Sequence, residues 1–268
     1  MFVYPQINPV AFSLGPLKVH WYGLMYLLGF LFGFLLIKHR VRKFNLGWSN
    51  DQLVDLLFYA AIGVVLGGRI GYVLFYNLPY YLHHPLQVFA IWDGGMSFHG
   101  GMLGVTLAIL LWSFKHKRAF FTVTDTVAPV VPIGLATGRV GNFINGELWG
   151  RVTHVPWAMI YPQAGSLPRH PSEVYEFLLE GVLLFIILWI YSARRPPRMA
   201  VTGVFLIGYG SFRFLCEFFR QPDPQLGFVA FGWVTMGQVL SLPMILLGVF
   251  LFILAYRCKR TKAQGEEL

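Results

Sequence analysis

Seven long apolar segments dominate the pattern of hydrophobic and polar positions along the chain. Each approaches the ~20 residues that an α-helix needs to cross a bilayer. They lie at residues 19–37, 52–76, 86–114, 119–138, 174–193, 200–218 and 233–256. The pattern therefore predicts an all-α, polytopic membrane protein of about seven transmembrane helices, with residues 1–268 forming a single integral membrane domain.

Two of these segments contain residues that interrupt a regular helix. The third is broken by Asp93-Gly94-Gly95 and by His99-Gly100-Gly101. Glycine-rich backbone at membrane depth must face protein or water, so a re-entrant stretch near residues 94–101 is expected. The fourth contains Pro129 and Pro132, which predict a kink.

Basic residues give the expected orientation. Of the 21 Lys and Arg residues, 14 fall in alternate connections, which the positive-inside rule places in the cytoplasm. The N-terminus is then outside and the C-terminus cytoplasmic, with residues 139–171 as the largest non-cytoplasmic connection. The 14 residues are Lys38, Arg40, Arg42, Lys43, Lys115, Lys117, Arg118, Arg194, Arg195, Arg198, Arg257, Lys259, Arg260 and Lys262.

The remaining basic residues are nearly all arginine, unlike the cytoplasmic set. They are Lys18, Arg69, Arg139, Arg151, Arg169, Arg213 and Arg220. Arginine recognises phosphate and carboxylate groups bidentately, so this bias indicates an anion-binding site at the outer leaflet. Internal ion pairing is the alternative, because Glu147, Glu173 and Glu217 are expected on the same side.

Composition agrees with a membrane location. Hydrophobic residues make up 56% of the chain and charged residues only 12%, about half the share in soluble domains. The net charge of +9 could suggest a nucleic-acid partner. The basic residues instead lie in short blocks between apolar segments, so no nucleic-acid binding is expected.

The richest cluster of polar residues is GRVGNFINGELWGR at 138–151. We expect a glycine-rich loop in which Arg139, Asn142 and Asn145 supply donors, while Glu147 orients an arginine or accepts a proton. An ordinary interfacial turn is the alternative, which this density of polar side chains disfavours.

Three further segments carry candidate chemistry. His99 can accept a proton near neutral pH, although it could also be a structural histidine between helices. Tyr209, Arg213 and Glu217 are spaced by four, so they share one helix face, with aromatic-belt and snorkelling roles as the alternative. Tyr22 lies at the outer end of the first segment, where an interfacial tyrosine is common.

Several catalytic signatures are missing from the sequence. It contains no GxSxG, HExxH, Walker A or dinucleotide-binding pattern, and no spacing typical of a metal site. The chain therefore offers phosphate-binding donors and a candidate base, but no obvious nucleophile, and neither a metal nor another cofactor is expected.

Four segments, in this order along the chain, resemble the prolipoprotein diacylglyceryl transferases. They are HWYGLMY (20–26), FHGGMLG (98–104), GRVGNFINGELWGR (138–151) and YGSFRFLCEFFRQPD (209–223). The resemblance covers nearly the whole chain. It implies transfer of the diacylglyceryl group of phosphatidylglycerol to the thiol of the lipobox cysteine in a prolipoprotein signal peptide, with glycerol phosphate released.

The resemblance also implies a location and residue roles. The enzyme would lie in the bacterial cytoplasmic (inner) membrane, with its active site toward the periplasmic side, and would carry out the first step of lipoprotein maturation. By this resemblance, Arg139 matches the family's phosphatidylglycerol-binding arginine, and Arg213 matches its second critical arginine. The other matching positions are His99, Tyr22, Asn142, Gly150, Tyr209, Glu147 and Glu217. We expect His99, Arg139, Arg213 and Tyr209 to be catalytic, and Asn142, Asn145, Tyr22, Gly150, Glu147 and Glu217 to bind substrate.

Three other functions compete with this hypothesis. A lipid transporter or flippase predicts internal repeats, and none is clear. An intramembrane protease needs a Ser/His pair or two intramembrane aspartates, but Asp55 and Asp125 lie near segment ends. A non-catalytic scaffold leaves the arginine bias unexplained.

Overall fold

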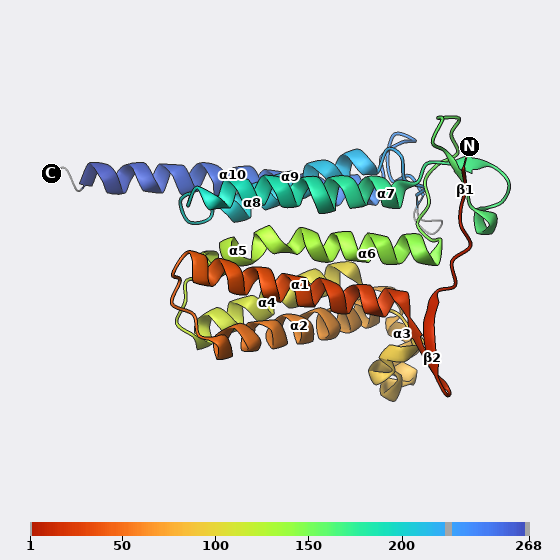
Figure 1. The fold of residues 1–268 in the computed structure, drawn as a ribbon, viewed down its shortest axis with the longest axis horizontal. Helices are drawn as coiled ribbons and strands as arrows, with labels where there is room; N and C mark the ends of the chain where they lie inside the picture. Colours follow the sequence, from red (N-terminus) through yellow and green to blue (C-terminus); the bar gives the residue numbers. More distant parts are fainter. Residues whose placement is uncertain (1, 223–226, 266–268) are drawn as a thin grey trace. The chain divides into compact units, whose positions relative to one another are not determined.

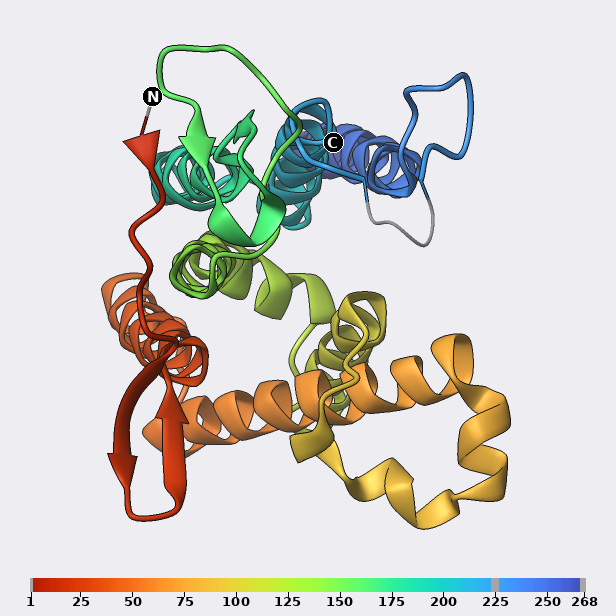
Figure 2. The ribbon, with the colours of Figure 1, turned by 90° about the vertical axis from the view of Figure 1, so that its right-hand side faces the viewer.

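The computed structural model describes residues 2–222 and 227–265 and divides the chain into two compact units. The first unit contains the residues up to Leu36 and from Val127 onward, and the second contains Ile37–Thr126. Each unit is predominantly helical (Figures 1 and 2).

Helices of the first unit lie side by side along much of their length (Figure 1). Contacts between α6 and η5, between α8 and α9, and between α9 and α10 hold this bundle together. Its helices are most of α1 (Trp21–Lys43), the 3₁₀ turn η3 (Ala128–Val130), α6 (Val131–Asn145), α7 (Ser172–Glu176), the π-helical η5 (Phe177–Leu183), α8 (Leu184–Ala193), α9 (Ala200–Cys216) and α10 (Met236–Gly265).

Short strands join the connection before α7 to the N-terminal segment. Strand β1 (Phe2–Val3) pairs in parallel with β4 (Met159–Ile160), and β4 pairs antiparallel with β5 (Pro168–Arg169). This arrangement is visible in Figure 2. A separate hairpin consists of β2 (Val10–Leu14) and β3 (Leu17–His20), and the 3₁₀ turn η4 (Pro162–Ala164) lies between β4 and β5.

The second unit is organised around α2 (Asn50–Tyr76) and α4 (Phe98–Lys115), which pack closely. A Cβ atom on Gly67 would lie 2.7 Å from the Cα atom of Gly104, so only glycine permits this approach. Ser49 begins α2 with a reciprocal capping box to Gln52. The remaining elements are α3 (Leu78–His83), the 3₁₀ turns η1 (Pro85–Phe89) and η2 (Ile91–Asp93), and α5 (Phe120–Val127).

The predicted membrane architecture is confirmed. Five helices of the described residues are long and apolar enough to cross a membrane, and Ala200–Cys216 is a shorter apolar helix. Each predicted apolar segment contains helix, while the exact number of spans and the orientation of the termini stay predictions. The short strands were not predicted, because β1, β4 and β5 have only two residues each.

The observed helix boundaries differ from the predictions in two places. Gly94 and Gly95 precede α4 with positive φ angles, whereas Gly100 and Gly101 are inside the helix. The predicted stretch at 94–101 is therefore part turn and part helix, and the apolar residues 86–97 do not continue α4. At the predicted kink, the 3₁₀ turn η3 contains Pro129 and separates α5 from α6, while the bend itself stays a prediction.

Candidate functional site: a buried arginine and glutamate network

Arg139 lies near the middle of α6, where that helix closely approaches η5. A Cβ atom on Gly181 would lie 2.7 Å from the Cβ atom of Ala136, so glycine is needed for this contact. The approach brings Arg139 Nε to 2.9 Å from Glu176 Oε2, and Nη2 to 3.5 Å from Glu180 Oε2.

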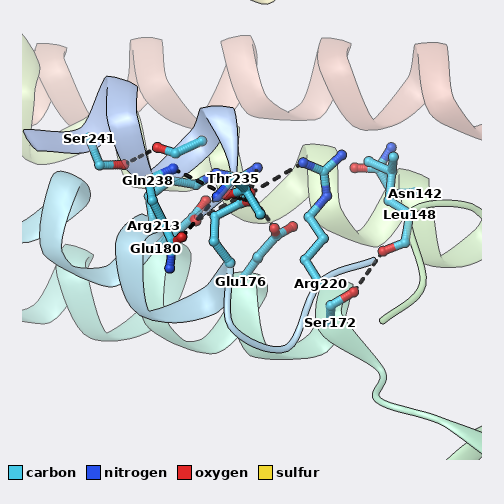
Figure 3. Close-up of polar contacts among 12 residues, drawn as sticks. Asn142, Leu148, Ser172, Glu176, Glu180, Arg213, Arg220, Thr235, Gln238 and Ser241 are labelled. Carbon is cyan, nitrogen blue, oxygen red and sulfur yellow. Dashed lines mark hydrogen bonds and ion pairs between the residues drawn. The ribbon is translucent and has the colours of Figure 1, made fainter. Parts of the chain in front are cut away.

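Arg213 on α9 reaches the same carboxylates. Its Nη1 donates a hydrogen bond to Glu176 Oε1 and lies 3.8 Å from Glu180 Oε1, while Nη2 donates to Glu217 Oε1 at 2.5 Å. Figure 3 shows Arg213 with Glu176 and Glu180. Glu176 is therefore in contact with two arginines from different helices, so α6 and α9 converge on one carboxylate.

The glutamates of this network are removed from solvent. Glu173, Glu176 and Glu180 each have an exposed fraction of 0%, and their spacing of three and four places them on one helix face. Removing one member of a buried ion pair typically costs about 3–5 kcal/mol, because the remaining charge stays buried without compensation. The network is thus expected to tolerate substitution poorly.

Glu217 connects α9 to the beginning of α10. The Thr235 hydroxyl donates to Glu217 Oε2 at 2.6 Å, and Arg220 Nη1 donates to Oε1 at 3.3 Å. Arg151 donates to the backbone oxygens of Glu217 and Arg220 at 3.0 and 2.9 Å. Arg151 therefore supports the site through the backbone, and burial lowers its pKa from the ordinary value.

A second group of polar side chains continues from Arg139. Its Nη1 donates to Asn142 Oδ1 at 3.3 Å, and Asn142 Nδ2 donates to Glu147 Oε1 at 2.8 Å. Asn145 Nδ2 lies 3.4 Å from the same glutamate oxygen. The structure thus brings four predicted site residues into one hydrogen-bonded chain.

The prediction of a loop throughout residues 138–151 is wrong for its first half. Helix α6 continues to Asn145 and ends at Gly146, which adopts a left-handed conformation with φ 63°. The Tyr4 hydroxyl donates to the backbone oxygens of Phe143 and Ile144 at 2.6 and 2.8 Å, and so caps this helix end. Burial and nearby Glu173 raise the pKa of Tyr4, which keeps the phenol protonated as a donor.

Gly150 lies where two backbone segments cross. It forms a β-bridge with Arg220, and its N–H donates to the His170 backbone oxygen at 2.8 Å. A Cβ atom here would lie 2.5 Å from the Phe219 oxygen and 2.6 Å from the His170 Cβ atom. The close crossing is sufficient to explain why glycine occupies this position.

Two predicted tyrosines also belong to the first unit. The Tyr22 ring packs against Gly141 on α6, and its hydroxyl lies 3.3 Å from that of Tyr26. Tyr209 is 6% exposed and lies in a core cluster with Leu184 and other apolar side chains. Tyr209 precedes Arg213 by one turn of α9, as the spacing predicted.

His99 belongs to the second unit, as the second residue of α4. Ser97 caps the N-terminus of this helix, and its side chain accepts a hydrogen bond from the Gly100 N–H. Arg69 also lies in this unit and is 5% exposed. Its guanidinium donates to the backbone oxygens of Gln87, Val88, Gly94 and Gly95, so it anchors the chain that leads to α4.

Sequence reasoning missed the main partners of the arginines. Glu176 and Glu180 lie inside the predicted apolar segment 174–193, and the spacing of three and four that they form with Glu173, just before it, was the available signal. The ion-pairing alternative is therefore realised for Arg139 and Arg213. Arg169 instead donates to the Gly150 oxygen at 3.2 Å and lies 3.3 Å from Gln221 Oε1. Asp223, within the segment 209–223, lies outside the described residues.

The fold and this network define a polytopic helical membrane protein whose arginines and glutamates meet inside a bundle. The family model described as prolipoprotein diacylglyceryl transferase matches residues 9–254. The chain belongs to this family, which confirms the resemblance found in the sequence.

Named relatives cover almost the entire chain. The phosphatidylglycerol–prolipoprotein diacylglyceryl transferase of Legionella pneumophila (strain Paris) is 61% identical over 252 residues, which is 94% of this chain and 98% of the relative. The protein of the same name from Coxiella burnetii (strain RSA 331 / Henzerling II) is 60% identical over 259 residues, which is 97% and 99% of the two chains.

Proposed function

We propose that this membrane protein transfers the diacylglyceryl group of phosphatidylglycerol to a prolipoprotein, a step of lipoprotein maturation. The relatives are named for these two substrates. The observation that carries the proposal is the convergence of Arg139 and Arg213, from two helices, on one buried carboxylate. Two guanidinium groups held this close form a natural receptor for a phosphate group.

The chemistry accounts for a site without an enzyme nucleophile. The thiol of the lipobox cysteine loses its proton to a base, and the sulfur attacks the glyceryl carbon that carries the phosphate oxygen. A sulfur–carbon bond forms, the carbon–oxygen bond breaks, and the electron pair leaves with glycerol phosphate. A free thiol has a pKa of about 8.5, so a positioned base increases the reactive thiolate.

Arg139 and Arg213 are the proposed phosphate ligands. Negative charge grows on the phosphate as the carbon–oxygen bond breaks, so these donors stabilise the transition state more than the ground state. One well-placed donor can contribute ~3–4 kcal/mol to catalysis. Glu176 occupies the arginine donors here, and the lipid phosphate would compete for them.

Other predicted residues receive supporting roles in this proposal. Asn142 and Tyr209 donate to phosphate or headgroup oxygens, and Tyr22 and Asn145 complete the headgroup site. Glu147 and Glu217 orient the amides and arginines that they contact. Gly150 permits the backbone crossing beside the site.

His99 is the proposed base that accepts the thiol proton, with Tyr209 and Glu147 as alternatives. A His99→Gln enzyme should lose most of its single-turnover rate near neutral pH, because glutamine cannot accept a proton. Near-normal rates at every pH would exclude His99 as the base and leave the alternatives to be tested in the same way.

The proposed location is the bacterial cytoplasmic membrane, with the site facing the periplasm. The apolar helices support a multi-pass membrane protein, and a lipid substrate requires access from the bilayer. A cysteine-labelling experiment in intact cells tests the orientation. Cysteine residues introduced at positions 15 and 165 should react with a membrane-impermeant thiol reagent in intact cells. Cys258 should react only after the cells are opened.

Purified protein, phosphatidylglycerol and a lipobox peptide provide the direct test of function. Glycerol phosphate should be released in a one-to-one ratio with modified peptide. A matched peptide with serine in place of cysteine should give no release, because the thiol is the nucleophile. No release from well-folded protein and the cysteine peptide would refute the transferase proposal.

A further inference from the structure

Of the three glutamates that pair with arginine, Glu180 makes the longest contacts. Its exposed fraction is 0%, and neither of its oxygens accepts a hydrogen bond from any described residue. The nearest cationic nitrogens belong to Arg139, at 3.5 Å, and Arg213, at 3.8 Å. Glu176 and Glu217, in contrast, both accept hydrogen bonds from Arg213.

The groups that face Glu180 come from three helices. Arg139 faces it from α6, and Arg213, Tyr209 and Cys216 face it from α9. Glu176 lies one turn earlier on its own helix. Glu180 itself is in the π-helical stretch η5, an irregular geometry that is frequent at functional sites.

Charge balance sets the consequence for anion binding. Three arginines (Arg139, Arg213 and Arg220) contact three glutamates (Glu176, Glu180 and Glu217), so the charges of these six ion-paired groups sum to zero when all are ionised. A bound phosphodiester adds one negative charge to this buried set. An uncompensated charge in such surroundings is strongly unfavourable, and a buried group usually responds by changing its protonation state.

We propose that Glu180 takes up one proton when the lipid phosphate binds to Arg139 and Arg213, which makes it the residue that couples lipid binding to pH. The inference rests on the proposed function of the two arginines. One proton moves from solvent to the Glu180 carboxylate, and no other bond forms or breaks. Protonation of the carboxylate restores the neutrality of the ion-paired groups. The neutral carboxyl group no longer pairs with Arg139 and Arg213, so both guanidinium groups can bind the phosphate.

Proton uptake fixes the pH dependence of lipid binding. Affinity is constant at low pH, where Glu180 already holds a proton before the lipid arrives. It falls by about tenfold per pH unit once Glu180 is ionised in the free protein but protonated in the complex. Binding is therefore favoured at low pH.

Calorimetry on the wild-type protein measures the proton directly. The full chain in nanodiscs of phosphatidylcholine is titrated with short-chain phosphatidylglycerol, in two buffers of different ionisation enthalpy, between pH 6 and 9. The expected result is an uptake that rises toward one proton per lipid as the pH increases. Zero uptake throughout this range would overturn the inference, whatever the variants do.

Substitutions then assign the proton. In Glu180→Gln, lipid affinity should be independent of pH and at least equal to the low-pH affinity of the wild type, because glutamine mimics the protonated carboxyl. Glu173→Gln is the matched control, a buried glutamate on the same face whose Oε1 accepts from the Tyr161 hydroxyl at 2.7 Å. His99→Gln is the second control.

Both controls should keep the wild-type slope of affinity against pH, whatever their absolute affinity. A slope that disappears in Glu173→Gln or His99→Gln, and persists in folded Glu180→Gln, would assign the proton elsewhere.

The peptide transfer assay separates this inference from the proposed function. An active transferase with pH-independent lipid binding refutes only the role of Glu180, and proton-linked binding without transfer refutes the activity.

Discussion

Replacing Arg139 with lysine tests whether the shape of the guanidinium group, and not only its charge, is required. Three nitrogens of Arg139 reach three separate partners, namely Glu176, Glu180 and Asn142, at 2.9, 3.5 and 3.3 Å. Lysine has a single nitrogen on a flexible stem and can replace one of these contacts well. The Arg139→Lys variant therefore keeps the charge but loses about two interactions.

The size of the loss follows from the proposed phosphate contact. A guanidinium can give the phosphate two parallel donors, whereas a lysine nitrogen acts as a single point charge. Losing one well-placed donor to the charge that grows on the leaving phosphate costs about 3 kcal/mol, which corresponds to roughly a hundredfold in kcat/KM. The contacts with Glu176, Glu180 and Asn142 exist in the free protein, so their loss affects how well the site is held in place.

The assay compares kcat/KM of Arg139→Lys and wild type for peptide modification in vesicles of defined phosphatidylglycerol content. Lys18→Arg is a suitable control, because it makes the reverse exchange on the exposed hairpin strand β3, and it should retain wild-type kinetics. Equal kinetics for Arg139→Lys and wild type would refute the need for a forked donor. A loss that disappears at saturating lipid would confine the role of Arg139 to lipid binding.

Three other substitutions probe the framework around the site. Gly150→Ala should destabilise the protein by about 1–3 kcal/mol, because its Cβ atom would overlap the Phe219 oxygen. Gly33→Ala is the control: a Cβ atom at this position would have nothing within 4 Å, so the melting temperature should stay unchanged. Equal melting temperatures for the two variants would contradict the packing argument. Tyr4→Phe should cost about 1–3 kcal/mol in thermal unfolding, since two carbonyl oxygens at the end of α6 lose their donor; a variant as stable as wild type would show that water replaces the phenol. Burial lowers the pKa of His170, so the unfolded chain gains a proton first as the pH falls through about 6.5, and stability declines below that pH. His170→Gln should lose this part of the decline in melting temperature between pH 7.5 and 5.5, and an unchanged difference between the two pH values would exclude His170 as its source.

Apolar segments and motif residues predicted the membrane fold and much of the site. Runs of about 20 apolar residues specify helices because the bilayer leaves few other structures, so α1, α2 and α10 were straightforward to predict. The placement of Arg139, Asn142 and Glu147 in one hydrogen-bonded chain agrees with their grouping in one sequence segment.

The partners of the arginines were harder to predict, for a physical reason. Contacts such as Arg213 with Glu176 join residues 37 positions apart, and local spacing carries no information about which helices become neighbours. Glu176 and Glu180 were also hidden inside an apolar segment that hydropathy alone assigns to the membrane. Gly150 was predicted to bind substrate, whereas its surroundings show a backbone crossing that only a glycine can fill.

The same paired charges bear on how the protein is inserted into the membrane. The segment 172–193 carries Glu173, Glu176 and Glu180, and a single carboxylate at the centre of an isolated helix raises the cost of insertion by about 2.5–3.5 kcal/mol. Arg139 is synthesised earlier, on α6, and contacts two of these glutamates. Pairing of the glutamate-bearing helix with α6 therefore offsets part of this cost, whereas Arg139 itself is made before its acidic partners.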